Sequence, residues 1–151
     1  PKTPTPPPIW VAGRKKAAMR RAARYADGWL PYMYTPEQLA ESLATIRELA
    51  VEAGRDPGSV RPGLFVWSYV HEDNARARQT AIDMLSVNYN QDFSKLVDKY
   101  ALAGDPDHCK RRLQEYVDAG AELVMLAPAA LDDAVAPSIE LMAREVMPAF
   151  R

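Results

Sequence analysis

The sequence has 151 residues, of which 48% are hydrophobic and 26% are charged, a composition typical of a globular protein with a real core. Its formal net charge of -1 gives no electrostatic reason to expect a nucleic-acid partner. No apolar run approaches the ~20 residues that span a bilayer. The single cysteine, Cys109, excludes an internal disulfide and a cysteine-rich zinc site. We therefore expect a cytoplasmic location and no metal, membrane or nucleic-acid partner.

The first eight residues are proline-rich and include no initiator methionine. Residues 1–8 read PKTPTPPP, which is typical of an extended, polyproline-like connector. They lead directly into the apolar run Ile9–Val11, with no polar segment between. We therefore expect a connector over residues 1–8, one domain over residues 9–151, and a chain that is part of a longer protein.

Two strands and two helices are predicted in the first third of the chain. The β-branched and aromatic residues of Ile9–Ala12 indicate a strand. The Ala- and Arg-rich segment Lys15–Tyr25 indicates a helix, and Trp29–Pro31 indicates a second, very short strand. Thr35 is a suitable N-cap for the next helix, and Gly54 lies where a glycine commonly ends one.

A buried strand and two helices are predicted next. Gly63–Val70 is almost continuously apolar, which suits a strand that is covered on both faces of a parallel sheet. Asp73 is a suitable cap for the following helix. After a polar break at residues 88–91, a short helix is predicted over Phe93–Tyr100.

The last third of the chain repeats the helix–strand–helix pattern. Asp105 begins a helix that ends at Gly120, Leu123–Leu126 forms the fourth predicted strand, and a last helix follows Pro128. Strand and helix thus alternate four times, which predicts an α/β protein with a parallel sheet. Two architectures fit: a small open, doubly wound sheet, or half of a closed (β/α)8 barrel, which has roughly 250 residues.

Several short motifs occur in an order that resembles one family. Pro7–Arg14 and Ala22–Pro31 are similar to the strand–helix–strand pattern of luciferase-like monooxygenases and their F420-dependent relatives. Ala53–Pro57, Ala103–Pro106 and Val117–Ala121 agree in order and spacing. The resemblance implies an α/β fold that is the C-terminal half of a (β/α)8 TIM barrel, with four βα units that form its fifth to eighth strands.

Ala12, Gly13, Arg14 and Lys15 lie where the first predicted strand meets its helix. A glycine there allows close backbone approach, and the free N–H groups and the dipole of the first helical turn favour an anion. The resemblance implies that this loop binds the phosphate of a flavin or deazaflavin. Family members often carry a further small residue or a Ser or Thr here, in place of the cations of this chain. A surface turn with solvated cations is the alternative.

Five other residues are candidates because they follow predicted strands or match a region of the family. Trp29, Pro31 and Tyr32 lie at the end of the second strand, on the face where barrel active sites form, and the resemblance places this segment beside the cofactor tail. Trp29 alternatively fills core space. His71 follows the third strand and is a candidate to contact substrate, as is Lys99, which matches a region beside the family's substrate pocket. A polar cap and a surface cation are the respective alternatives.

The resemblance implies a flavin-type oxidoreductase that binds F420, or alternatively FMN, and either transfers a hydride to or from a small organic substrate or oxygenates it. It also implies that the residues acting on the cofactor ring come largely from the first four βα units, so no catalytic residue is assigned. Open strand edges and an uncovered apolar face are states that proteins avoid. A non-catalytic half-barrel that pairs with its own copy or with a separate N-terminal half is therefore a second hypothesis, and a different phosphate-binding barrel enzyme is a third.

Overall fold

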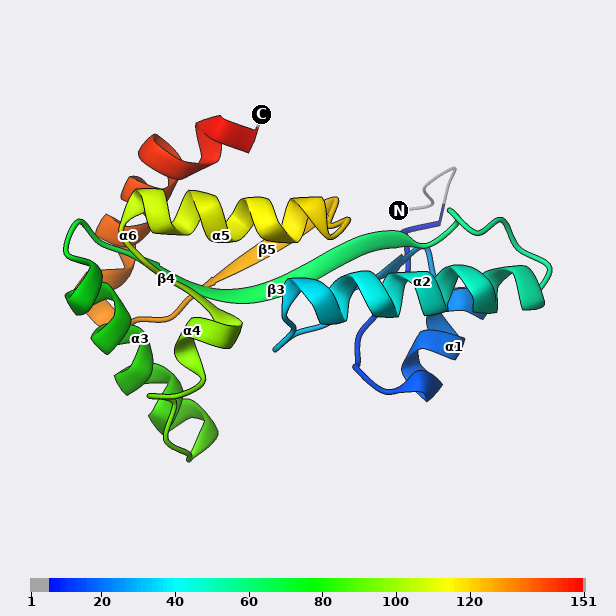
Figure 1. Cartoon of the computed structure of the whole chain (residues 1–151), viewed down its shortest axis with the longest axis horizontal. Coiled ribbons are helices and arrows are strands. Elements are labelled where there is room, and N and C mark those ends of the chain that lie inside the picture. Colours follow the sequence, from blue (N-terminus) through cyan, green and yellow to red (C-terminus); the bar gives the residue numbers. More distant parts are fainter. Residues whose placement is uncertain (1–5, 151) are drawn as a thin grey trace.

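The computed structural model describes residues 6–150, so most of the predicted connector, residues 1–5, lies outside the described residues. Residues 6–8 are exposed and have no regular secondary structure. The chain then alternates between short strands and longer helices (Figure 1).

The first half of the chain contains two two-residue strands and two helices. Strand β1 (Trp10–Val11) leads into helix α1 (Lys16–Tyr25), and strand β2 (Gly28–Trp29) leads into helix α2 (Pro36–Glu52). Helix α2 begins with a capping box, in which Thr35 Oγ1 accepts a hydrogen bond from the Gln38 N–H and the Gln38 side chain accepts one from the Thr35 N–H. The predicted start of this helix is confirmed.

The second half contains three strands. Strand β3 (Arg61–Val70) is the longest and is followed by helix α3 (Asn74–Tyr89), the short helix α4 (Val97–Tyr100) and strand β4 (Ala101–Gly104). The remaining elements are helices and one strand: α5 (Pro106–Asp118), β5 (Leu123–Pro128), η1 (Asp132–Ala134), α6 (Val135–Leu141), the π-helical turn η2 (Met142–Val146) and η3 (Met147–Phe150).

All strand pairs are parallel, as predicted, and β3 is the centre of the sheet. Strands β2 and β4 follow each other along one edge of β3, because β2 pairs with Arg61 and Pro62 whereas β4 pairs with residues 67–70. Strand β5 pairs with residues 63–68 on the other edge, and β1 pairs with β2. The order β1–β2–β3–β5 thus places strands side by side in chain order.

The prediction of four strands is wrong in number, because β4 is a fifth strand among the described residues. The segment Ala101–Gly104 is only four small or apolar residues long, too short to show a strand period, and was expected to connect two helices. Its extended conformation comes from pairing with the last four residues of β3. The predicted short helix over Phe93–Tyr100 is correspondingly shorter and covers only Val97–Tyr100.

Helices cover one face of the sheet. Leu64 and Val66 of β3 point to this face and join the main core with the inner sides of α1, α2 and α5. Trp29 of β2 belongs to the same core and is fully buried. This helix-covered face supports the C-terminal strand ends, where the loops that carry the candidate site begin.

The opposite face of the sheet is covered at one end. There Trp67 and Tyr69, near the C-terminal end of β3, pack with α3 and α4 in a second core cluster. The Trp67 indole N–H donates to the Tyr89 hydroxyl over 2.9 Å. Further along this face, Leu123 and Met125 of β5 remain 39% and 47% exposed. We call the exposed part of this face, formed by Trp10, Tyr32, Phe65, Leu123 and Met125, the open sheet face.

Candidate functional site

The loop between β1 and α1 has a backbone that requires glycine. Gly13 adopts φ +118°, a region that side chains disfavour, and a Cβ placed on it would lie 2.9 Å from the Cβ of Ala18. Helix α1 begins directly after this loop, with Lys15 as its N-cap and no side-chain cap. The Ala18 N–H already donates to the Lys15 carbonyl over 2.8 Å, so the N–H groups of Lys16 and Ala17 are those left available to a ligand at this end of α1.

Two buried aromatic residues hold this loop from the helix-covered side. The indole N–H of Trp29 donates to the Gly13 carbonyl over 3.0 Å, and the Tyr34 hydroxyl donates to the Arg14 carbonyl over 3.2 Å. Trp29 is fully buried, Tyr34 is 6% exposed, and their rings pack edge to face with centroids 5.6 Å apart. The two loop carbonyls therefore point toward the core.

The amide N–H groups of the loop consequently point away from the core. In a trans peptide the C=O and N–H point in opposite directions, so the N–H of Arg14 is directed away from Trp29 and that of Lys15 away from Tyr34. Within residues 6–150 neither N–H has a hydrogen-bond acceptor. Two adjacent outward amides at a helix N-terminus form an arrangement that binds anions.

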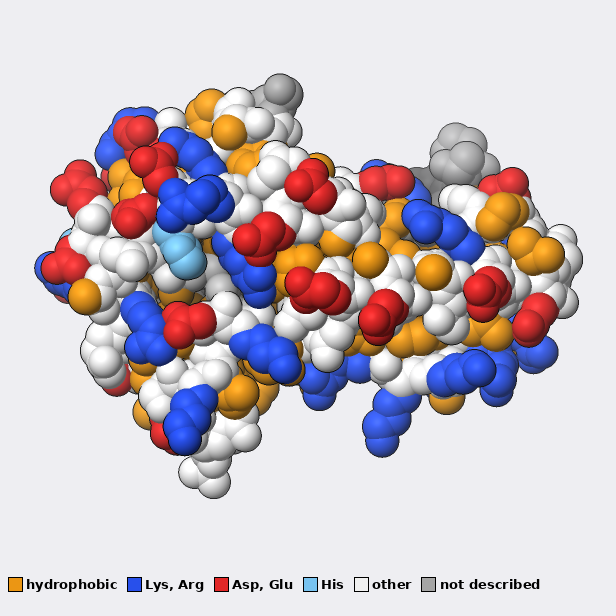
Figure 2. Space-filling view, in the orientation of Figure 1, with side chains coloured by type: hydrophobic (Ala, Val, Ile, Leu, Met, Phe, Trp, Pro, Cys, Tyr) orange, Lys and Arg blue, Asp and Glu red, His pale blue; other side chains and the backbone are white. Residues whose placement is uncertain are grey.

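Two cations stand beside these amides. The Arg14 guanidinium lies 5.3 Å from the centre of the Tyr32 ring, and one of its nitrogens is 3.4 Å from the Met33 carbonyl. A cavity of about 360 Å³ opens next to Arg14 and Lys15, between the starts of α1 and α2. Figure 2 shows that Lys and Arg side chains gather over α1 below the acidic side chains of α2. The cavity beside the loop is thus lined by the two cations Arg14 and Lys15 and by one carboxylate, that of Glu41.

The structure brings together most of the predicted cofactor residues. Ala12 and Tyr32 are exposed at the same end of the sheet as Gly13. Pro31 is buried beneath Tyr32, and the Trp29 side chain contacts the loop from inside the protein. Trp29 thus reaches the predicted phosphate loop through a hydrogen bond to its backbone, and its side chain fills core space as the alternative interpretation proposed.

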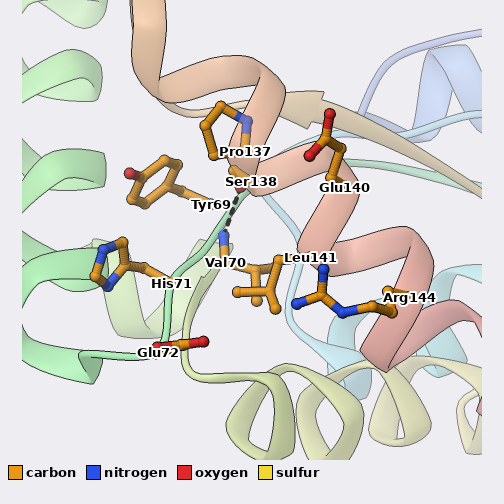
Figure 3. Close-up of a pocket in the computed structure, with 9 residues that line it drawn as sticks. All are labelled: Tyr69, Val70, His71, Glu72, Pro137, Ser138, Glu140, Leu141 and Arg144. Carbon is orange, nitrogen blue, oxygen red and sulfur yellow. Dashed lines mark hydrogen bonds between the residues drawn. The ribbon is translucent and has the colours of Figure 1, made fainter.

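His71 lies beyond the C-terminal end of β3, where it lines a different cavity, of about 260 Å³. Its Nδ1 accepts a hydrogen bond from the Asp73 N–H over 2.9 Å, so the ring is oriented by its own loop. Figure 3 shows His71 and Glu72 on the β3 side of this cavity, facing Glu140 and Arg144 of the C-terminal helical segment, with Ser138 accepting from the Val70 N–H.

Lys99 is exposed on α4, and its ammonium lies 5.1 Å from the centre of the Tyr100 ring. Lys99 also contributes to a lowered pKa of Glu37, at the start of α2, although the main cause is a hydrogen bond from Thr35. The cavity of about 260 Å³ that His71 lines does not include Lys99. The structure therefore does not unite the two predicted substrate residues.

Several residues that support the loop were not predicted. Ser42 donates to the Tyr34 hydroxyl over 3.2 Å, and Tyr116 of α5 donates to the Tyr34 carbonyl over 2.7 Å. Burial raises the pKa of the Tyr116 hydroxyl, so it stays a donor. Met33 adopts φ +54°, an uncommon conformation for a residue with a side chain. The capping box of Thr35 and Gln38 directly follows Tyr34, and it is the local sequence signal that marks where α2 begins.

Within residues 6–150, no three His, Cys, Asp or Glu side chains converge in a way that would hold a metal ion. The helices of this same region are all too short or too polar to cross a bilayer.

The family model described as luciferase-like monooxygenase matches residues 1–95, well over half of the chain. The chain therefore belongs to the luciferase-like monooxygenase family. A phthiodiolone/phenolphthiodiolone dimycocerosates ketoreductase of Mycobacterium bovis is 40% identical over 57 residues, which cover 37% of this chain and 15% of that protein.

Matches that span nearly the whole chain are more distant. An F420-dependent hydroxymycolic acid dehydrogenase of Mycobacterium tuberculosis is 26% identical and covers 97% of this chain and 43% of that protein. Among solved structures, an F420-dependent secondary alcohol dehydrogenase in complex with an F420-acetone adduct superposes with a TM-score of 0.84 at 19% identity. That match covers 99% of this chain and 51% of the other. A monooxygenase from Streptomyces bottropensis gives 0.71 at 23% identity, over 96% and 49% of the two chains. This chain spans about half the length, or less, of these relatives.

Proposed function

We propose that this chain forms the C-terminal half of a (β/α)8 barrel, in which β1, β2, β3 and β5 are the fifth to eighth strands. Their spatial order follows the chain order, as barrel closure requires. Helices cover one face of the sheet along its length and the other face only at the C-terminal end of β3. The open sheet face would be the interior side of the barrel, and β4 an insertion beside the end of β3.

We further propose that the loop formed by Ala12, Gly13, Arg14 and Lys15 binds the phosphate of F420, with FMN as the alternative. The observation that carries this proposal is the pair of outward, unpaired amides at Arg14 and Lys15, held beside two cationic side chains. This donor set matches a phosphate oxygen pair, and Gly13 is needed because a Cβ at this position would clash with Ala18 and displace the loop.

The proposed activity is that of an oxidoreductase acting on a small organic substrate. When bound, F420 or FMN supplies the ring that exchanges a hydride or reacts with oxygen. The residues of this chain would bind the phosphate end and orient the cofactor from it, with exposed Tyr32 beside the tail. His71, which follows β3, and Lys99, which precedes β4, remain proposed substrate contacts.

The open sheet face favours a second candidate function, a scaffold or flavin-binding half-barrel that associates through this face. Leu123 and Met125 are exposed there without a covering helix among the described residues. Such a module would pair with a second copy or with a separate N-terminal half. Both candidates share the phosphate loop and differ in whether turnover occurs.

The proposed site is tested by titrating F420 and FMN separately against the intact protein and following fluorescence quenching. We expect one of the two to bind, and Gly13→Ala to raise its dissociation constant at least about tenfold, because the new Cβ would clash with Ala18 and strain the loop.

Gly54→Ala is the matched control for the backbone strain. Gly54 also has a positive φ, +72°, but has open space around its Cβ position and ends α2 away from the loop. This variant should lose stability without losing affinity. Failure of both ligands to bind, or an unchanged dissociation constant in Gly13→Ala, would contradict the proposed site.

A further inference from the structure

A chain of buried polar groups lies directly under the proposed phosphate loop. It runs from Ser42 to the Tyr34 hydroxyl and on to the Arg14 carbonyl, and it is joined by the indole N–H of Trp29 on the Gly13 carbonyl. All three side chains are buried and belong to the helix-covered side of the sheet. Tyr34 and Ser42 also line the cavity beside Arg14 and Lys15, and the Tyr34 hydroxyl proton is directed to the Arg14 carbonyl.

We propose that Trp29 and Tyr34 are positioning residues that fix the orientation of two successive peptide groups, and through them set the affinity of the loop for a phosphorylated cofactor. The inference rests on the proposed function. In this proposal the two side chains act on the cofactor indirectly, through the hydrogen bonds that they donate to the carbonyls of Gly13 and Arg14, and not by direct contact.

The direction of each hydrogen bond supports this action. Ser42 donates its proton to the Tyr34 oxygen, so the Tyr34 proton is left to donate to the Arg14 carbonyl. The indole N–H of Trp29 can only donate. Each loop carbonyl therefore receives one fixed donor, and each following amide is held pointing outward.

The loop needs these donors because glycine makes an inverted peptide accessible. Rotation of the Gly13–Arg14 peptide changes ψ of Gly13 and φ of Arg14, and a residue without a Cβ tolerates such rotation at low energetic cost. An inverted peptide would present the carbonyl oxygen to the phosphate, which repels it. Trp29 prevents this inversion, since it would leave the buried indole N–H without its partner, and Tyr34 holds the following Arg14–Lys15 peptide in the same way.

A second aromatic residue fixes Tyr34 itself. Tyr116 of α5, fully buried, donates to the Tyr34 carbonyl over 2.7 Å and joins the loop after β2 to a helix 82 residues further along the chain. The position of Tyr34, and with it the loop geometry, is thus determined by the tertiary core.

The test is Tyr34→Phe in the intact protein, with dissociation constants measured for two ligand pairs: F420 with its phosphate-free deazaflavin, and FMN with riboflavin. In the wild type the phosphorylated member of the pair that the protein binds should bind more tightly. Tyr34→Phe should reduce that phosphate preference about fivefold, the effect of one hydrogen bond, and leave binding of the phosphate-free ligand within about twofold.

Trp29→Phe should reduce the phosphate preference at least as much, and Tyr25→Phe is the control. Tyr25 is 71% exposed at the C-terminal end of α1, so removal of its hydroxyl should leave the dissociation constants of both ligands of a pair unchanged. A purely structural role for Tyr34 would lower the melting temperature and weaken both members of a pair equally. A loss of the phosphate preference without weaker binding of the phosphate-free ligand would therefore indicate a positioning role and not a purely structural one.

The outcomes distinguish the two proposals. A wild-type protein without any phosphate preference would overturn the proposed phosphate site, and this inference with it. A wild-type preference that Tyr34→Phe and Trp29→Phe both retain would overturn the positioning role while leaving the phosphate site standing.

Discussion

At the scale of single residues, the sheet depends on two glycines that make room for Trp10. The Trp10 ring lies over Gly28 of β2, and a Cβ on Gly63 of β3 would also meet it, at 2.8 Å. Because β1 and β2 are each only two residues long, this ring contributes much of the apolar contact between the first strands and β3.

We expect Gly28→Ala to lower the free energy of unfolding by about 1–3 kcal/mol, because its Cβ would overlap the indole of Trp10. Denaturant unfolding measures the change. The same substitution in a Trp10→Leu background should have a smaller effect, since the overlap is relieved. Equal penalties in both backgrounds would show that the packing of Trp10 on Gly28 is not the cause.

At the scale of elements, an ion pair fastens the helical segment after β3. Arg78 of α3 donates to both carboxylate oxygens of Asp98 in α4, each over 2.8 Å, and to the Ser94 carbonyl over 2.7 Å. The guanidinium of Arg78 holds the pKa of Asp98 below its usual value of 3.8. The pair ties α3 to α4 beside the second core cluster.

The stabilising effect of this pair should depend on pH. Since the pKa of Asp98 is lower in the folded chain, the contribution is present above a pH of about 4 and is lost as the pH falls through the folded value. Asp98→Asn should therefore lower the free energy of unfolding at pH 7 by only about 0.5–1 kcal/mol, because the carboxylate is 63% exposed.

The penalty of Asp98→Asn should shrink as the pH falls through the lowered pKa of Asp98, because the carboxylate is then increasingly protonated in both states. Chemical denaturation at several pH values measures it. Asp83→Asn on α3 is the control for loss of a charge, since the Asp83 carboxylate accepts only from Gln79 among the described residues. A penalty for Asp98→Asn that stays constant down to pH 2 would contradict the assignment.

At the scale of the whole molecule, the open sheet face is the feature that distinguishes this chain from a closed domain. Met125 and Leu123 stand on the edge strand β5, and Tyr32 and Phe65 continue the same apolar surface. An exposed surface of this kind beside an unpaired strand edge favours association.

We expect the 151-residue chain to self-associate, and Met125→Lys to shift it toward the monomer by at least about tenfold in dissociation constant, because a charge on the open sheet face opposes burial. Sedimentation velocity measures the change. Val87→Lys on α3, where the side chain is already 82% exposed, is the control. If both variants gave the same proportion of monomer and associated species, the self-association would have to use a surface other than the open sheet face.

Local signals in the sequence were sufficient for much of the secondary structure. The predicted N-caps Thr35, Asp73 and Asp105 each accept from the backbone three residues on, and Gly54 has the positive φ of a helix end. The apolar run in β3 was correctly predicted as a parallel strand, but it is not covered on both faces along its whole length, since Phe65 lies on the open sheet face. These features depend on residues close together in the chain, so their spacing suffices to predict them.

The sequence by itself placed a glycine loop between the first strand and its helix, and the positive φ of Gly13 agrees with that. Its role as an anion site stays a prediction. Only the tertiary structure decided how that loop is held. The orientation of its amides depends on Trp29 and Tyr34, and the position of Tyr34 depends on Tyr116, 82 residues away. Strand β4 likewise exists because β3 offers a free edge, which no local pattern in Ala101–Gly104 records.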